Sequence, residues 1–84
     1  MSIEEIEEIN PEALLCDGFD EAIIGMAERI NLGPVVAYDV DKIIDIMVER
    51  DGMTYGEAIE YFDYNILGAW MGENTPVFIT TKIN

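Results

Sequence analysis

The sequence contains no histidine, one cysteine and only four basic residues among its 84 positions. Without histidine, the chain lacks the most common general base and the most common transition-metal ligand. A single thiol cannot form an intramolecular disulfide, so Cys16 is expected to be a small core side chain in a reducing compartment. These absences disfavour catalytic triads, zinc sites and haem ligation, and no cofactor is expected.

Long apolar runs and a basic N-terminal segment are also missing. No stretch approaches the roughly 18 apolar residues that a membrane span needs. The segment Met1 to Asn10 carries four glutamates and no lysine or arginine, unlike a signal peptide. Four basic residues cannot neutralise a row of phosphates, which argues against direct binding to nucleic acid or to anionic membranes. We expect a soluble, cytoplasmic protein.

Acidic residues are the most prominent feature of the amino-acid composition. Eighteen acids against four bases give a net charge of −14. Such a surface repels itself at low salt and is stabilised when salt screens it. The charge fits simple solubility or a saline habitat, and it also fits a protein that imitates a polyanion. Because half of the residues are hydrophobic, we predict one folded domain over residues 1–84.

The first helix is expected at the N-terminus. Ser2–Glu5 has the spacing of a capping box, and isoleucine recurs at every third position from Ile3 to Ile9. Asn10-Pro11 then predicts a new start, with one or two helical turns over residues 12–17 and a buried pair of leucines. Whether residues 1–10 fray or dock on a partner is left open.

Two strands and two helices follow. Residues 19–30 fit either a helix or a strand, but turn residues precede the β-branched run at Val35–Tyr38, which favours a hairpin over residues 22–38. Asp39 is a good cap for a helix that ends at Gly52. A second capping box at Thr54–Glu57 begins the next helix, which is expected to bury Ala58, Ile59, Phe62, Ile66 and Ala69.

A final strand is predicted at residues 77–81, because β-branched residues follow Pro76. The fold class is therefore α+β, with the order α-β-β-α-α-β. We predict a small antiparallel sheet, made of the hairpin and the C-terminal strand, covered on one face by an antiparallel helical hairpin.

The most unusual cluster lies at the end of the last predicted helix. Tyr61, Tyr64, Asn65 and Trp70 fall within three turns of each other. One interpretation is structural, with Asn65 tying the helix to the next loop and Trp70 filling the core. The other is a shallow aromatic pocket that binds a small, planar, nucleotide-like molecule.

Two further groups are candidates for function. Asp17, Asp20 and Glu21 flank Gly18 and could offer oxygen ligands to a hard cation, although carboxylates are common in loops. Ile46 points away from the apolar stripe of its helix, and Tyr55 also needs cover. In so small a chain such side chains often mark a subunit contact, so we predict a homodimer or higher oligomer.

Several segments resemble a known family. The runs D-G-F-D-E-A-I-I-G, V-A-Y-D, R-D-G-M and G-A-W-M-G-E-N-T-P resemble small uncharacterised proteins of tailed bacteriophages, which have prophage-like relatives in bacteria. The likeness covers residues 17–79. It implies a viral setting in the cytoplasm of a bacterial host and supports the hairpin, but it carries no activity.

The sequence therefore favours recognition over chemistry. The first hypothesis is a non-enzymatic phage accessory protein that binds a host or phage protein, with polyanion mimicry as one version. The second is a small-ligand binder that uses the aromatic cluster around Asn65. The third is an enzyme whose metal is held by Asp17, Asp20 or Glu21.

Overall fold

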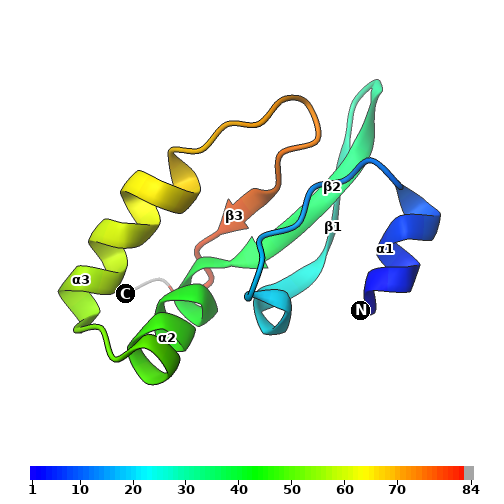
Figure 1. Ribbon diagram of the computed structural model, residues 1–84. Helices are drawn as coiled ribbons and strands as arrows, with labels where there is room; N and C mark the ends of the chain where they lie inside the picture. The colour runs from blue at the N-terminus through cyan, green and yellow to red at the C-terminus, as the bar shows by residue number, and fades with distance from the viewer. Residues whose placement is uncertain (83–84) are drawn as a thin grey trace.

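The computed structural model describes residues 1–82 and shows the predicted α+β class and element order (Figure 1). Within these residues there are three short helices, two helical turns and three strands. Their bounds are α1 (Ile3–Ile9), η1 (Asp20–Ala22), β1 (Ile23–Arg29), β2 (Leu32–Asp39), α2 (Val40–Asp51), α3 (Tyr55–Tyr61), the π-helical turn η2 (Phe62–Leu67) and β3 (Val77–Ile79).

The sheet has the order β1-β2-β3, with β2 in the middle. The hairpin prediction is confirmed, because β1 and β2 pair antiparallel with Met26 opposite Val36. The C-terminal strand instead pairs parallel to β2, with Tyr38 opposite Phe78, so the sheet is mixed. Figure 1 shows the reason for the parallel direction. The chain leaves the end of β2 through α2, returns in the opposite direction through α3, and turns once more in the following loop, so that β3 runs in the same direction as β2.

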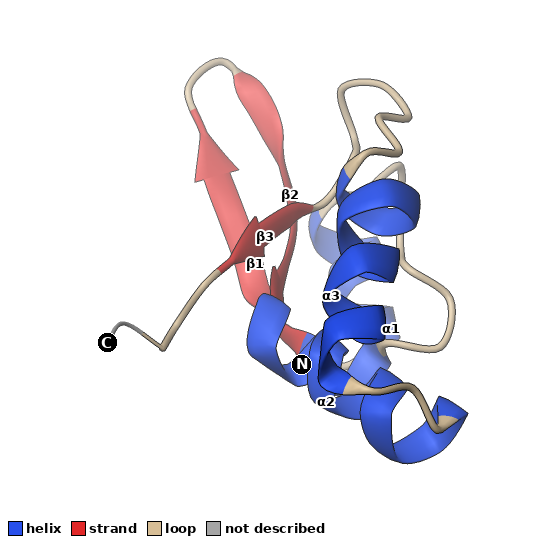
Figure 2. Cartoon of the chain, turned by 90° about the vertical axis from the view of Figure 1, so that its left-hand side faces the viewer, coloured by secondary structure: helices blue, strands red, loops and turns tan. Residues whose placement is uncertain are grey.

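One face of the sheet packs against the helices, as predicted. The ring of Phe78 stacks on Tyr38 with centroids 5.8 Å apart, and it meets the edge of Phe62 at 5.4 Å. Figure 2 shows the sheet on one side and the pair α2 and α3 on the other. Tyr38, Ile43 and Met47 are almost completely buried in this layer. The fully covered core therefore lies between the sheet and the helical pair.

The opposite face of the sheet is more open. Because side chains alternate along a strand, Val77 and Ile79 point away from the face that carries Phe78. Both are more than a third exposed, and Ile24, at a register shift in β1, is half exposed. This face carries no helix in Figure 2.

The helix starts and ends follow the sequence closely. Both predicted capping boxes form, at Ser2–Glu5 and at Thr54–Glu57. The side chain of Asp39 accepts a hydrogen bond from the amide of Asp41 at 3.0 Å, as expected for a cap. Gly52 ends α2 in the left-handed conformation, with φ of +69°.

The predicted turns at residues 12–17 are wrong, because this segment is not helical. Asn10 caps the end of α1, and its side chain is used elsewhere. Its Nδ2 donates to the carbonyl of Pro34 at 2.7 Å, and its Oδ1 accepts from the amide of Glu12 at 3.1 Å. The amide of Leu14 donates to the carbonyl of Asn74 at 3.1 Å. The segment is therefore fastened along other parts of the chain, and its two leucines are not buried.

Burial in the helices also differs in part from the expectation. Ile6 of α1 is 1% exposed and joins the core, so this helix docks on the chain itself. In α3 and η2, Ala58 and Phe62 are buried, whereas Ile59 is exposed; Ala69 lies in the loop after η2 and is also exposed. The π-helical turn changes the spacing of the buried face after Tyr61. Within residues 1–82, no helix has the length and apolar character of a membrane span.

Candidate functional site

The outer face of α3 and η2 carries most of the aromatic cluster. Tyr61 is 45% exposed and Tyr64 is 77% exposed. Together they border an open hollow of about 380 Å³. We call this surface the tyrosine–glutamate face, and it consists of Met53, Glu57, Glu60, Tyr61, Tyr64 and Asn65.

Local structure places these side chains on one side of the helix. The Thr54 cap fixes where α3 begins, so residues 57, 60, 61 and 64 follow at helical spacing on one face. The π-helical turn begins at Phe62 and carries Tyr64 and Asn65 outward. Such turns are rare and occur frequently at functional sites.

The electrostatic character of this face is negative. Its lining includes two carboxylates and no basic residue. The carboxylate of Glu57 accepts a hydrogen bond from the backbone amide of Thr54 at 2.9 Å, which lowers the pKa of Glu57 and keeps it ionised. No lysine or arginine occurs in the sequence between Arg50 and Lys82. The face is therefore suited to a cationic partner.

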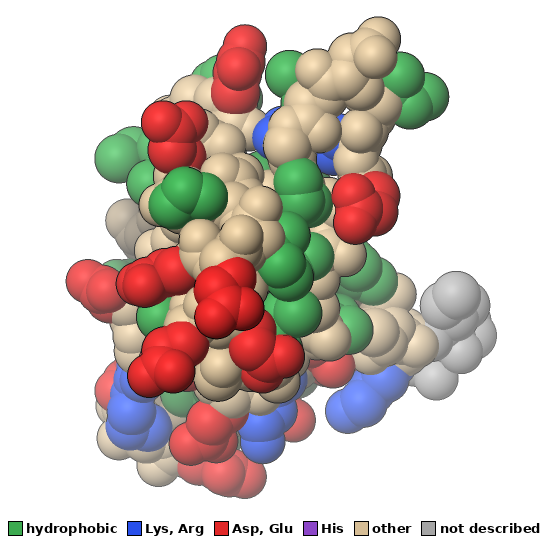
Figure 3. Space-filling model, turned by 90° about the vertical axis from the view of Figure 1, so that its right-hand side faces the viewer, with side chains coloured by type: hydrophobic (Ala, Val, Ile, Leu, Met, Phe, Trp, Pro, Cys, Tyr) green, Lys and Arg blue, Asp and Glu red, His purple; other side chains and the backbone are tan. Residues whose placement is uncertain are grey.

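The acidic character extends over the rest of the surface. Figure 3 views the end of the molecule that carries α1, where acidic side chains spread over the face and hydrophobic ones lie between them. The ion pair between Arg50 and Asp51, with Nε and Oδ1 2.9 Å apart, is the one salt bridge formed within residues 1–82. Most carboxylates therefore face solvent without a cationic partner on the chain.

A second concavity lies next to the tyrosine–glutamate face. It is a cleft of about 340 Å³ between residues 14–19, η2 and the start of β3. Phe19 and Phe78 are among its apolar walls, and Asp17 and Asn65 are among its polar lining. Tyr61 and Asn65 line both the cleft and the hollow.

The aromatic walls of the cleft are fixed by other contacts. Phe19 is 8% exposed, and the guanidinium of Arg50 lies over its ring at 5.1 Å from the centroid. Phe78 packs between Tyr38 and Phe62. These rings are held in place by the core, so the cleft does not need to be formed by a ligand.

Cys16 also lines the cleft, but its surroundings do not activate it. Burial raises the pKa of the Cys16 thiol, and the negative charge of Asp17 raises it further. The thiol is therefore protonated at neutral pH, whereas a nucleophilic cysteine needs a thiolate. Its backbone amide donates to the hydroxyl oxygen of Tyr38 at 2.8 Å, and burial raises the pKa of Tyr38 to about 12.

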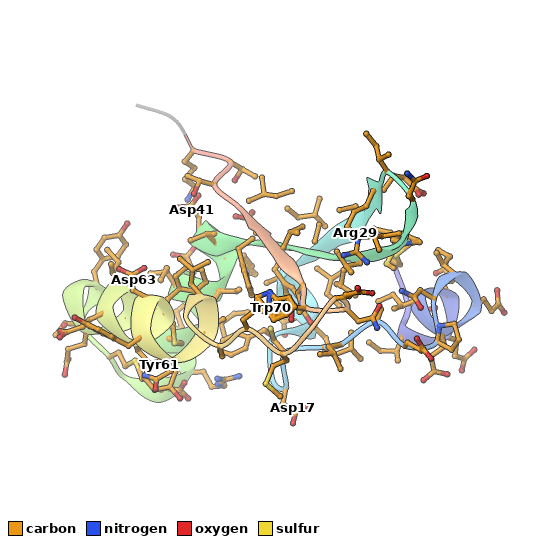
Figure 4. The ribbon with its side chains drawn as sticks, turned by 90° about the horizontal axis from the view of Figure 1, so that it is seen from above. Asp17, Arg29, Asp41, Tyr61, Asp63 and Trp70 are labelled. Atoms are coloured by element: carbon orange, nitrogen blue, oxygen red, sulfur yellow. The ribbon has the colours of Figure 1, made fainter. Side chains whose placement is uncertain are left out.

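The structure separates Trp70 from the rest of the predicted pocket. It brings Tyr61, Tyr64 and Asn65 together around one hollow, but Trp70 lines neither the hollow nor the cleft. The indole is 67% exposed, so it does not fill the core either. In Figure 4, Trp70 lies well apart from Tyr61, which projects from α3. The loop after η2 turns away from the helix axis and takes Trp70 with it.

The predicted carboxylate cluster is not brought together as a cation site. Asp17 lines the cleft, whereas Glu21 lines a different hollow beside Arg50 and Ile46. Asp20 begins the turn η1 and is exposed. Within residues 1–82, no three acidic or cysteine side chains form a group that could hold a metal ion.

The two residues predicted at a subunit contact lie on different surfaces. Ile46 is half-buried and packs against the core, and it borders the hollow near Arg50. Tyr55 is 61% exposed and borders a hollow with Ile59 and Leu67. The homodimer stays a prediction, and these two residues do not define one interface.

Sequence reasoning found the helical wall of the cleft but missed the wall opposite it. That wall comes from residues 14–19, which overlap the segment 12–17 for which helical turns were expected. No local pattern pairs this segment with residues 65–78, because the link is made by long-range bonds such as Leu14 to Asn74. No protein-family model, curated protein or solved structure matches the chain.

Proposed function

We propose that this chain is a small non-enzymatic binding protein that recognises a basic surface of a partner protein through the tyrosine–glutamate face. The observation that carries this proposal is the exposure of Tyr61 and Tyr64 around a hollow lined by Glu57 and Glu60 and by no cation. Both the exposed tyrosine rings and the glutamate carboxylates can contact the cationic side chains of a protein surface rich in lysine or arginine.

The chemistry of such a contact is specific. The face of a tyrosine ring attracts an ammonium or guanidinium group within about 6 Å of its centroid. A carboxylate beside it adds a charge-assisted hydrogen bond. Tyrosine is also enriched among the residues that contribute most to binding at protein interfaces. The net charge of −14 also attracts a basic partner at distances beyond direct contact, which raises the rate of association.

The resemblance to phage proteins supports a partner from the bacterial host or from the phage, met in the host cytoplasm. The non-enzymatic part of the proposal is supported by the absence of histidine from the sequence and by the protonated state of Cys16. Polyanion mimicry is the version in which overall charge alone attracts the partner. It predicts that the position of each carboxylate is unimportant.

The test is affinity capture from bacterial lysate with two matched pairs of variants. Glu60→Lys and Glu28→Lys change the net charge equally, but Glu60 lies on the face and Glu28 on the hairpin. Tyr64→Ala and Ile30→Ala each remove an exposed apolar side chain, from the face and from the hairpin tip. We expect a basic protein that is retained by the wild type and by both hairpin variants, and lost with both face variants.

Two results distinguish the alternatives. Equal weakening by Glu60→Lys and Glu28→Lys, with no effect of Tyr64→Ala, means that overall charge is recognised and supports the mimic. Capture that is the same for all four variants, or that does not weaken as salt is raised, contradicts recognition of a basic surface by either route.

A further inference from the structure

We propose that the cleft between residues 14–19, η2 and the start of β3 binds an uncharged, planar nitrogen heterocycle of nucleoside size. This site is separate from the protein-binding face proposed above, although the two adjoin at Tyr61 and Asn65. Size, rigidity, hydrogen bonding and charge each support this ligand class.

The size and walls of the cleft suit a ring system. Its volume of about 340 Å³ lies at the lower end of the range for small-molecule pockets, about 300–1,000 Å³. Phe78 is half-buried and offers part of its ring as a preformed wall, whereas Phe19 is 8% exposed and adds a smaller apolar surface; both rings are held by neighbouring side chains. Met71 at the rim is 71% exposed, and its flexible side chain can close over a flat ligand.

Asn65 brings a carboxamide to the lining of the cleft, beside the carboxylate of Asp17 and the hydroxyl of Tyr61. The hydroxyl of Thr75 is already used, because it donates to the carbonyl of Gly72 at 2.7 Å and accepts from the amide of Met71 at 2.8 Å. Asn65 is exposed and lines the cleft. Its carboxamide offers a donor and an acceptor side by side, the arrangement that pairs with the edge of a nucleobase.

The charge of the cleft excludes a phosphate. Asp17 is among the lining residues, and no lysine or arginine is. The nearby Arg50 is engaged, because its Nη1 donates to the carbonyl of Gly18 at 2.7 Å and its Nε donates to Asp51 at 2.9 Å. A phosphate would meet a carboxylate and a protein of net charge −14 with no cation to bind it. The ligand is therefore nucleoside-like and not nucleotide-like.

The test is titration calorimetry of the full chain with adenosine, cytidine and the 5′-monophosphate of each. We expect saturable binding of at least one nucleoside, with its monophosphate at least tenfold weaker than the nucleoside itself. Asn65→Leu, which keeps the side-chain volume, is expected to weaken nucleoside binding at least tenfold. The control Ile30→Ala, at the exposed hairpin tip, is expected to bind like the wild type. Thermal melts of each variant without ligand show whether it is folded.

A second pair of variants tests the charge argument. Asp17→Asn is expected to narrow the gap between the bound nucleoside and its monophosphate at least threefold, because it removes the carboxylate from the cleft. Glu28→Gln makes the same change of net charge on the hairpin and is expected to leave that ratio unchanged. Since Cys16 lines the cleft, the bound nucleoside is also expected to slow its alkylation by iodoacetamide.

The proposal is overturned if neither nucleoside binds saturably to the folded wild type, or if Asn65→Leu binds as tightly as Ile30→Ala. Monophosphate binding as tight as that of its nucleoside overturns the assignment to an uncharged ligand. None of these results bears on capture of a basic protein, because the variants Glu60→Lys and Tyr64→Ala lie outside the cleft lining.

Discussion

Tyr38 is the residue that links the core to the wall of the cleft. Its ring is completely buried and stacks on Phe78, and its hydroxyl accepts the amide hydrogen of Cys16. The sequence placed Tyr38 at the end of a strand, but it could not show that the phenol reaches a segment 22 residues away. That contact depends on the path of residues 12–17, for which local propensity wrongly predicted helical turns.

The phenol makes stability depend on alkaline pH. Burial raises the pKa of Tyr38 to about 12, from an ordinary value of about 10. The phenol keeps its proton in the native state at pH values where it loses it in the unfolded state. The contribution of Tyr38 to the free energy of unfolding is therefore fully present below about pH 10 and is lost as the pH rises toward 12. The loss is at most about 3 kcal/mol.

Urea unfolding between pH 8 and 11.5 measures this effect. The control Tyr38→Phe lacks the titrating phenol and is expected to lose less stability at alkaline pH; the loss that remains includes the one produced by the raised pKa of Cys16. It is also expected to be less stable at pH 8 by about 1–3 kcal/mol, because the Cys16 amide loses its acceptor. A pH profile that is identical in the two proteins would contradict the buried position of the phenol.

At the scale of elements, the helices were predictable because their ends carry strong local signals. The capping residues Ser2, Asp39 and Thr54 and the C-terminal Gly52 all act as expected. The parallel direction of β3 and the π-helical turn were not predictable, since both depend on how the helical pair packs on the sheet. The tyrosines of the candidate site could also be located from the sequence, because their placement follows from local helical spacing. The cleft beside them could not be located in this way.

Two glycines on either side of the α2–α3 connection allow a matched test. A Cβ at Gly52 or at Gly56 would meet nothing within 4 Å, so any effect of alanine there arises from the backbone. Gly52 has φ of +69°, and Gly52→Ala is expected to destabilise the fold by about 1–2 kcal/mol. Gly56 lies inside α3, and Gly56→Ala is expected to stabilise it by about 0.5–1 kcal/mol.

The measurement is the free energy of unfolding in urea for both variants against the wild type. Opposite signs confirm that the left-handed residue fixes where α2 ends and α3 begins. Equal effects of the two substitutions would show that the connection does not depend on Gly52.

At the scale of the whole molecule, charge is the feature that sequence analysis described most completely. The net charge is −14, and a single salt bridge pairs opposite charges within residues 1–82. We expect NaCl between 0.02 and 0.5 M to raise the free energy of unfolding, on the order of 1 kcal/mol, because screening weakens the repulsion among carboxylates. Stability that stays constant or falls over this range would contradict that repulsion.

The net charge attracts many basic proteins without selectivity. Selective recognition of one partner therefore depends on the tyrosine–glutamate face. A partner that uses the tyrosine–glutamate face loses contact area when Tyr64 is truncated, whereas a partner held by overall charge does not. Ile30 is 90% exposed and gives a reference for removal of an apolar side chain elsewhere.

The most direct measurement is the ratio of dissociation constants of the captured basic protein for Tyr64→Ala and for Ile30→Ala, at one salt concentration. A side chain at the centre of an interface contributes about 2 kcal/mol or more, so we predict a ratio of at least about thirtyfold. A ratio near one would contradict recognition through the tyrosine–glutamate face.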